Sequence, residues 1–318
     1  MLMTPNAFFR FRARKALKNS WQITLMVVFI ASLPSILTQV IGVLTGGDIS
    51  ARLMELAQDP AFLMASADSM MKQLTEALIG NGGKTYLLFS ALALLIAPAL
   101  TMGMHHYMID LLRGQADGVA SVFDRLRWFL KAIGLNLLVA MKAFLWAVPG
   151  MAVVIGGSAA AVTMADDVAA ALRTMFTIMS AGYILMMVLM IAAMLRYAMA
   201  MFVLADQPET GLLACIRRSK EIMKGRKTQL FALEFSFVLW HLLVMMAYVA
   251  VASMFGYVIG LTVQMFLNLF VASYQNCSVA AFFLQYHEGG ELQLVQPEET
   301  ESLTEDRDDA DPWHRNQN

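Results

Sequence analysis

Six long apolar runs limit the folds open to this sequence more than any other feature. They cover residues 21–44, 86–112, 129–155, 175–204, 230–254 and 257–283. Each is long enough to cross a bilayer core of about 30 Å as a helix, which takes about 20 residues. The chain is also 58% hydrophobic and only 15% charged, which is too apolar for an ordinary soluble domain. We therefore predict an all-α fold, a polytopic membrane bundle of six transmembrane helices over residues 21–286.

Arg and Lys residues are concentrated in alternate connecting segments. Five precede the first apolar run, four lie in or next to residues 113–128, and six lie in residues 206–228. The segments between them hold three, one and none. Because cytoplasmic loops carry the excess of Arg and Lys, residues 1–20, 113–128 and 206–228 are expected in the cytoplasm and loop 46–84 outside. The prediction is a multi-pass protein of the cytoplasmic membrane with both termini inside.

Two further segments lie outside the apolar runs. Residues 287–318 are acidic and have few apolar side chains to bury, so we expect a disordered cytoplasmic tail. Loop 46–84 mixes apolar and acidic residues, which predicts one or two amphipathic helices. These helices would lie on the outer leaflet, cap the bundle or meet a partner protein.

The three basic segments interleave cationic and apolar residues just before an apolar run. Residues 8–21, 119–129 and 212–227 share this pattern, which is typical of an amphipathic helix in the membrane interface. Asp206 and Glu209 predict a capping box at the start of the third helix, and Gly225 predicts its end. Anionic lipid headgroups are the expected partner. The candidate contacts are Arg10, Arg12, Arg14, Lys15, Arg125, Arg127, Arg217, Arg218, Lys220, Lys224, Arg226 and Lys227.

Three ionisable residues, Lys142, Arg196 and Glu234, fall inside the apolar runs. Such groups cost about 2.5–3.5 kcal/mol on insertion and are functional candidates by default. With a helical rise of about 1.5 Å per residue, each lies about 10–16 Å from the charged residue that flanks its run on the cytoplasmic side. These flanking residues are Lys131, Asp206 and Lys227. Glu234 is therefore predicted to pair with Arg196 or Lys142 and so to fix how three spans pack. Two alternatives stay open: a proton or ion relay with Glu234 as the exchanging acid, and an Arg196 that snorkels to the interface.

Six other polar residues interrupt the apolar runs. They are His105, His106, His241, Asn268, Gln275 and Asn276. His241 lies two helical turns from Glu234 and is expected to hydrogen-bond a neighbouring helix. The adjacent histidines lie near Asp110 in a local polar cluster, and the last three residues form one polar stripe that either joins helices or lines a pore. We favour the joining role, and without a metal-ligand spacing we predict no metal site and no cofactor.

Catalytic signatures are missing from the sequence. It has no nucleotide-binding loop, GxSxG elbow or HExxH motif, and its basic segments lack the soluble fold of nucleic-acid readers. Cys215 and Cys277 are far apart and are expected to be free thiols. We therefore expect a non-enzymatic membrane protein with a lipid-interacting or scaffolding role and no nucleic-acid partner. The alternative is a transporter or permease component that uses the intramembrane charges.

Residues 195–243 carry a family resemblance. Their motifs are Arg196-Tyr197 at the end of one run, a pattern of Ser219, Met223, Gly225 and Lys227, and then Leu233, Ser236, Phe237 and Trp240. With similar stretches at 14–21 and 114–123, the chain resembles the uncharacterised bacterial integral membrane proteins catalogued as domain of unknown function 975. It departs from that pattern at residues 272–274, where the family often has a Pro-Tyr pair. The resemblance implies a multi-span protein of the bacterial cytoplasmic membrane and no known activity.

Overall fold

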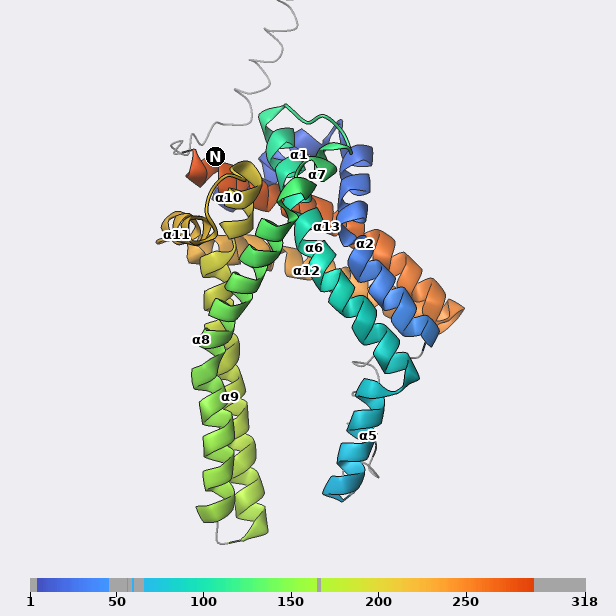
Figure 1. Ribbon diagram of the computed structural model, residues 1–318, viewed down its shortest axis with the longest axis vertical. Helices are drawn as coiled ribbons and strands as arrows, with labels where there is room; N and C mark the ends of the chain where they lie inside the picture. The colour runs from blue at the N-terminus through green and yellow to red at the C-terminus, as the bar shows by residue number, and fades with distance from the viewer. Residues whose placement is uncertain (1–4, 46–55, 57–58, 60–65, 165–166, 289–318) are drawn as a thin grey trace, which may run out of the picture. The chain divides into compact units, whose positions relative to one another are not determined.

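The computed structural model describes residues 5–45, 56, 59, 66–164 and 167–288, and all of the regular structure in these residues is helical (Figure 1). The helices are α1 (Pro5–Leu17), α2 (Trp21–Thr45), α5 (Ala67–Ile79), α6 (Asn81–Arg113), α7 (Ser121–Asp124), the 3-10 turn η1 (Leu126–Trp128), α8 (Phe129–Met164), α9 (Val168–Tyr197), α10 (Ala200–Asp206), α11 (Leu212–Ile222), α12 (Lys227–Phe255) and α13 (Tyr257–His287). The prediction of an all-α fold is confirmed.

Six of the described helical stretches are long and apolar enough to cross a membrane. They are Trp21–Thr45, Gly82–Arg113, Ser121–Ala160, Arg173–Asp206, Lys227–Phe255 and Tyr257–His287. Each coincides with one of the six apolar runs, so the predicted number of spans is confirmed. The chain is thus a multi-pass membrane protein by the length and composition of its helices.

The chain forms two compact units. One unit contains α1, α12 and α13, from residues 1–20 and 224–318, and the other contains α2 to α11, from Trp21–Met223. Helix α1 is therefore far in sequence from α12 and α13, the helices on which it packs.

Two helix pairs build most of the larger unit. In the first, α2 packs on α6, and the Thr24 and Tyr107 hydroxyls lie 3.1 Å apart in a buried contact. In the second, α8 and α9 run side by side (Figure 1). A Cβ atom on Gly150 would lie only 2.6 Å from Met186 Cβ, so these backbones approach closely because glycine stands at the contact. This is the small-residue packing that membrane helices use.

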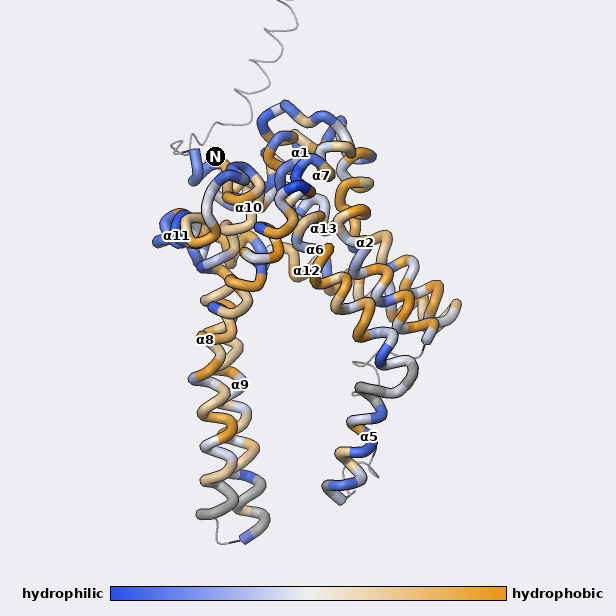
Figure 2. The backbone as a smooth tube through the Cα atoms, viewed as in Figure 1, coloured by the Kyte–Doolittle hydropathy of each residue, from blue (hydrophilic) through white to orange (hydrophobic). Residues whose placement is uncertain are grey.

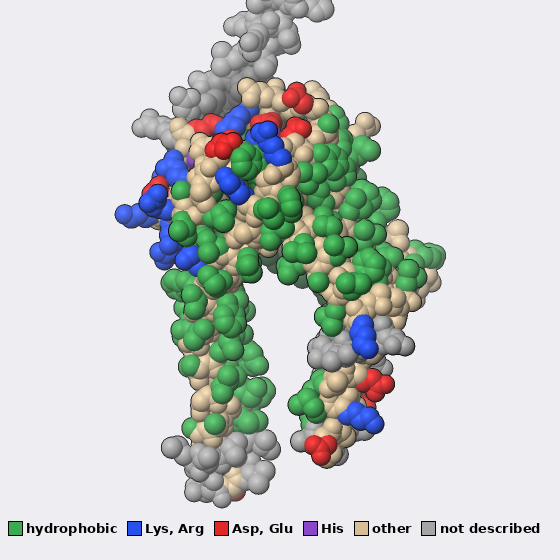
Figure 3. Space-filling view, in the orientation of Figure 1, with side chains coloured by type: hydrophobic (Ala, Val, Ile, Leu, Met, Phe, Trp, Pro, Cys, Tyr) green, Lys and Arg blue, Asp and Glu red, His purple; other side chains and the backbone are tan. Residues whose placement is uncertain are grey.

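Most residues of α8 and α9 are hydrophobic (Figure 2). Large hydrophobic side chains such as Leu137, Phe144, Phe176 and Met187 are exposed on them, and the space-filling view shows hydrophobic side chains over much of the pair (Figure 3). In water such a surface would be a large unprotected apolar patch. In a bilayer it faces lipid, which is what a span requires.

In the smaller unit, α12 and α13 form a hairpin that turns at Gly256, whose φ of +93° favours glycine. Helix α1 packs on α13 through Phe9, Ala13 and Leu17, all fully buried. The Phe9 ring meets the rings of Phe282 and Tyr286 at 5.4 Å and 6.2 Å. The apolar face of α1 is thus covered by protein within its own unit.

Several predicted details need correction or extension. Helix α6 begins at Asn81, before the apolar run that starts at residue 86. Helix α8 continues past residue 155 to Met164, and α9 begins at Val168, before residue 175. The predicted capping box is wrong: α11 starts after an extended Gly211 that makes no side-chain cap. Its predicted end fits, since the chain turns through Gly225 at φ +76° just after the helix.

Two predictions fall largely outside the described residues. For loop 46–84, α5 supplies one helix, while residues 46–55, 57–58 and 60–65 are outside the described part of the chain. The predicted acidic tail, residues 287–318, lies outside it from residue 289 onward.

Candidate functional site

Three polar side chains form a hydrogen-bonded chain between α12 and α13. Gln275 donates through Nε2 to the carboxylate Oε2 of Glu234, and its Oε1 lies 3.0 Å from His241 Nε2. Glu234 and His241 are seven residues apart, so they share one face of α12 at a separation of two turns. Gln275 reaches that face from the neighbouring helix and bridges both residues. We name these three side chains the Gln275 bridge.

Local packing holds the Gln275 bridge in place. On α12, Leu233 and Phe237 are buried next to Glu234, and the Phe237 ring packs edge-on against Tyr274 at 5.3 Å. Tyr274 directly precedes Gln275, so this ring contact positions the amide opposite Glu234. The three bridge residues come from two helices of the same unit. The structure thus joins Glu234, from the predicted group of ionisable residues, to His241 and Gln275, from the predicted group of other polar residues.

The rest of the predicted polar stripe behaves differently. Asn276 donates to the carbonyl oxygen of Ala272 in its own helix at 2.8 Å. Among the described residues, Asn268 makes no side-chain hydrogen bond that would join helices. Within its unit, Gln275 is therefore the member of the stripe that links α12 to α13.

Lys142 and Arg196 lie in the larger unit, on α8 and α9. The guanidinium carbon of Arg196 lies 5.9 Å from the centre of the Trp146 ring, one turn beyond Lys142. The Gly150–Met186 contact sets an antiparallel register in which Lys142 is level with the end of α9 that carries Arg196. The two cations therefore lie at a similar height along the α8–α9 pair. Their pairing with Glu234 would join the two units and stays a prediction.

The two adjacent histidines of α6 have different surroundings. The His106 Nε2 atom lies 3.2 Å from Asp110 Oδ2, and Arg125 Nη2 lies 3.2 Å from His106 Nδ1. Because an arginine side chain can only donate, Nδ1 accepts and the proton of neutral His106 is on Nε2. His105 is instead stacked on the Phe202 ring of α10 at a centroid distance of 3.9 Å. The predicted cluster thus contains His106 and Asp110, and Arg125 completes it.

These histidines do not assemble a metal site in the described part of the chain. No group of three His, Cys, Asp or Glu side chains there lies close enough to hold a metal ion.

Two charged contacts in the larger unit were not predicted from the sequence. Arg113 Nη1 lies 2.6 Å from Asp206 Oδ1 and so ties the end of α6 to the end of α10. Lys131 Nζ donates to the carbonyl oxygens of Pro208 and Glu209, at 2.9 Å and 3.2 Å. Together they hold the segment between α10 and α11. The signal available in the sequence was the placement of these charges at span ends, where helix-terminal partners are common.

The basic faces of α1 and α11 point away from the protein. On α11, Cys215, Ile216 and Ser219 are buried, whereas Arg217 and Arg218 are exposed. Figure 3 shows Lys and Arg side chains gathered over this helix. On α1, Arg14 and Lys15 are exposed, and Lys224 is exposed after α11; Arg10, Arg12 and Lys227 are half-buried.

The remaining cations predicted to contact lipid have aromatic or polar partners. Lys220 lies over the Tyr197 ring at 5.7 Å, and Arg226 lies over Tyr286 at 4.2 Å. Arg127 lies 5.6 Å from the centre of the Trp128 ring while its side chain remains exposed. These contacts orient the cations at the ends of the spans.

The buried thiol of Cys215 is chemically protected. Burial raises the pKa of this thiol above its usual range, against smaller lowering effects of a backbone hydrogen bond and of the Lys131 charge. A thiol with a raised pKa is largely protonated at neutral pH and a poor nucleophile. Cys215 and Cys277 are both free and buried, as expected for structural thiols.

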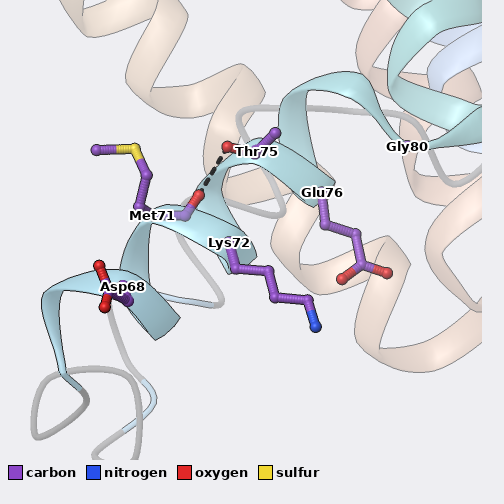
Figure 4. A pocket seen from close by; sticks show the side chains of 6 residues that line it. All are labelled: Asp68, Met71, Lys72, Thr75, Glu76 and Gly80. Carbon is purple, nitrogen blue, oxygen red and sulfur yellow. Dashed lines mark hydrogen bonds between the residues drawn. The ribbon is translucent and has the colours of Figure 1, made fainter.

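A hollow lies along α5 (Figure 4). It is lined by Asp68, Met71, Lys72, Thr75, Glu76 and Gly80. The lining comes from one helix and its end, and the labelled Thr75 hydroxyl is bonded to the carbonyl oxygen of Met71 in the same helix. The Gln275 bridge is a stronger candidate for function because side chains from two helices build it. The basic faces of α1 and α11 are stronger candidates because each presents two exposed cations of the same sign.

Comparison with known proteins gives a family and no activity. Neither a curated protein nor a solved structure matches the chain. A family model described as "Protein of unknown function (DUF975)" matches residues 3–288, which include all six candidate spans. The chain therefore belongs to this family of proteins of unknown function, as its motifs in residues 195–243 predict.

Proposed function

We propose that this is a non-enzymatic protein of the cytoplasmic membrane that binds anionic lipid headgroups through the basic faces of α1 and α11. In this proposal both termini and all the basic segments are cytoplasmic. The main observation in support is that each helix packs apolar residues against its own unit and presents Arg and Lys outward.

The packing of α1 and α11 has an electrostatic consequence. Most apolar residues of the two helices are covered, and Leu213 is the large one exposed on α11. Neither helix therefore needs to insert deeply, and the exposed cations are held at the ends of the spans. A Lys or Arg near an anionic surface contributes about 1 kcal/mol, and the attraction decreases within a Debye length of about 8 Å at physiological salt. Selective retention of anionic lipid is therefore expected to be salt-dependent.

The test replaces four exposed cations, Arg14, Lys15, Arg217 and Lys224, with Gln. Their summed contribution is about 4 kcal/mol, which corresponds to roughly three orders of magnitude in affinity at about 1.4 kcal/mol per tenfold. Native mass spectrometry of the purified protein would measure retained phosphatidylglycerol against phosphatidylcholine. The wild-type protein should prefer phosphatidylglycerol, and the fourfold variant should lose most of that preference.

Two exposed lysines supply the matched control. Lys72 on α5 and Lys84 on α6 lie outside both basic faces, so replacing them with Gln removes positive charge without altering α1 or α11. This variant should keep the wild-type lipid preference. Equal preference in wild-type and fourfold variant proteins would refute the proposal.

A transporter or permease component is the second candidate, supported by the polar contacts of Glu234 inside a candidate span. In proteoliposomes, a Glu234→Gln variant that inserts and remains stable but loses pH-dependent flux would favour transport, with Lys142 and Arg196 as further members of the pathway. A variant that only misfolds would favour a packing role for Glu234.

A further inference from the structure

We propose that the Gln275 bridge is a proton-binding site in which protonation of Glu234 reverses the Gln275 amide and moves the His241 ring proton from Nε2 to Nδ1. The ligand is a proton from water. The inference does not depend on lipid binding, and it would hold whether or not the protein transports a solute.

The observed arrangement corresponds to an ionised Glu234. The Gln275 amide donates through Nε2 to Glu234 Oε2, so its Oε1 is the atom that faces His241 at 3.0 Å. A carbonyl oxygen only accepts hydrogen bonds. His241 must therefore donate, and its ring proton lies on Nε2 in this state.

Protonation of Glu234 changes what the carboxyl group needs. A neutral carboxyl carries one O–H donor, and a buried donor without an acceptor costs about 1–3 kcal/mol. Rotation of the Gln275 amide by half a turn places its Oε1 opposite that O–H group. The amide nitrogen then faces His241, whose Nε2 must accept.

The Gln275 bridge takes up one proton in total. Glu234 gains one proton, and the amide of Gln275 rotates without changing its own protons. The neutral His241 ring releases the proton on Nε2 and takes up one on Nδ1, so its net charge does not change. No co-reactant beyond water is required.

Other titratable groups of the unit are directed elsewhere. On α13, the Tyr274 hydroxyl donates to the carbonyl oxygen of Arg10 at 3.4 Å, and Cys277 Sγ lies 3.9 Å from the carbonyl oxygen of Ala13. On α1, the charges of Arg10 and Arg14 act on Tyr274, and that of Arg12 acts on Cys277. Within the described part of this unit, His241 is the titratable side chain that is linked to Glu234, through the amide of Gln275.

The experiment follows both ends of the bridge in the full-length protein in lipid nanodiscs. Infrared spectroscopy reads the protonated carboxyl of Glu234, and nitrogen NMR of 15N-histidine-labelled protein reads the tautomer of His241, assigned by the signal lost in His241→Asn. In the wild-type protein the carboxyl band and the Nδ1–H tautomer should appear with the same midpoint pH. Because both readouts use the wild-type chain, this test does not require any variant to fold.

Two variants and one control sharpen the result. Gln275→Leu should leave the carboxyl band titrating while the His241 tautomer no longer follows it, and Glu234→Gln should remove both changes. Asn276→Ala is the matched control, because that neighbouring amide bonds to its own helix at Ala272, and it should behave as the wild type does. A His241 tautomer that does not change when Glu234 is protonated, or that changes equally in Gln275→Leu, would overturn the proposal and leave the bridge as a fixed link between α12 and α13.

Discussion

Gly103→Ala tests whether the close contact between α6 and α7 is required for stability. A Cβ on Gly103 would meet the backbone of Val122, with the carbonyl carbon at 2.8 Å and Cα at 3.0 Å, and the carbonyl oxygen nearer still. Carbon atoms in good contact are about 3.5–4.0 Å apart. The alanine can therefore fit only if α7 moves away by roughly 1 Å.

The cost of that movement can be worked from the surroundings. The side chain of Val122 is fully buried, and Arg125, which follows α7, holds His106. Overpacking of this kind costs about 1–3 kcal/mol, and the loss of a buried valine adds about 2 kcal/mol. Alanine regains about 1 kcal/mol over glycine in a helix. We expect the free energy of unfolding to decrease by about 2–4 kcal/mol, or Tm by about 4–8 °C at about 2 °C per kcal/mol.

The protein carries its own reporters for the measurement. Both cysteines are buried in the folded state, so a thiol-reactive dye added in detergent would follow thermal unfolding without an introduced label. Gly156→Ala is the matched control, because a Cβ there has no neighbour within 4 Å; its Tm should be unchanged or slightly raised. A Gly103→Ala variant as stable as the control would refute the reasoning.

Three other outcomes are expected. In the folded protein Cys215 should react slowly with a maleimide at neutral pH and faster as pH rises, since its raised pKa keeps the thiol protonated; mass spectrometry would measure this, and a neutral-pH rate equal to that of the denatured chain would contradict it. A double-mutant cycle on Arg113 and Asp206, each changed to Ala, should give a coupling energy of about 1 kcal/mol in thermal unfolding, whereas strictly additive effects would exclude a stabilising ion pair. Lys131→Met should increase protease cleavage between α10 and α11, because two backbone carbonyls lose their ammonium donor; cleavage at the wild-type rate would show that these bonds do not hold the segment.

The number of spans was predictable because hydrocarbon imposes a length. About 20 apolar residues are needed to cross it, and the six runs stand clear of their polar flanks. The ends of the helices were harder to predict, because glycine and alanine are apolar enough to continue a span and also common in turns. Helix α6 passes through Gly82 and Gly83, and α8 passes through Gly156 and Gly157. In lipid, a single segment satisfies its own backbone hydrogen bonds by remaining helical.

The candidate site was predictable by residue type but not by pairing. The free-energy cost of placing polar groups inside a membrane singled out Glu234, His241 and Gln275 separately. Which helices face each other depends on packing, which a single sequence does not display. The tight turn at Gly256 gave one usable constraint, since it makes α12 and α13 antiparallel neighbours. Their similar distances from that turn, 22 residues for Glu234 and 19 for Gln275, place the two side chains within about one helical turn of each other along the hairpin.

The length of the α8–α9 pair sets a geometric condition on the bilayer around it. Helix α8 has 36 residues and α9 has 30, which at about 1.5 Å per residue gives lengths of about 54 Å and 45 Å. A hydrocarbon core of about 30 Å cannot contain either helix upright over its whole length. The pair must tilt or extend past the core. Because the two backbones are in close contact at Gly150 and Met186, the helices are expected to tilt together as one rigid body. The angle of that body is therefore expected to follow membrane thickness, so that lipid chain length becomes a variable to which the protein responds.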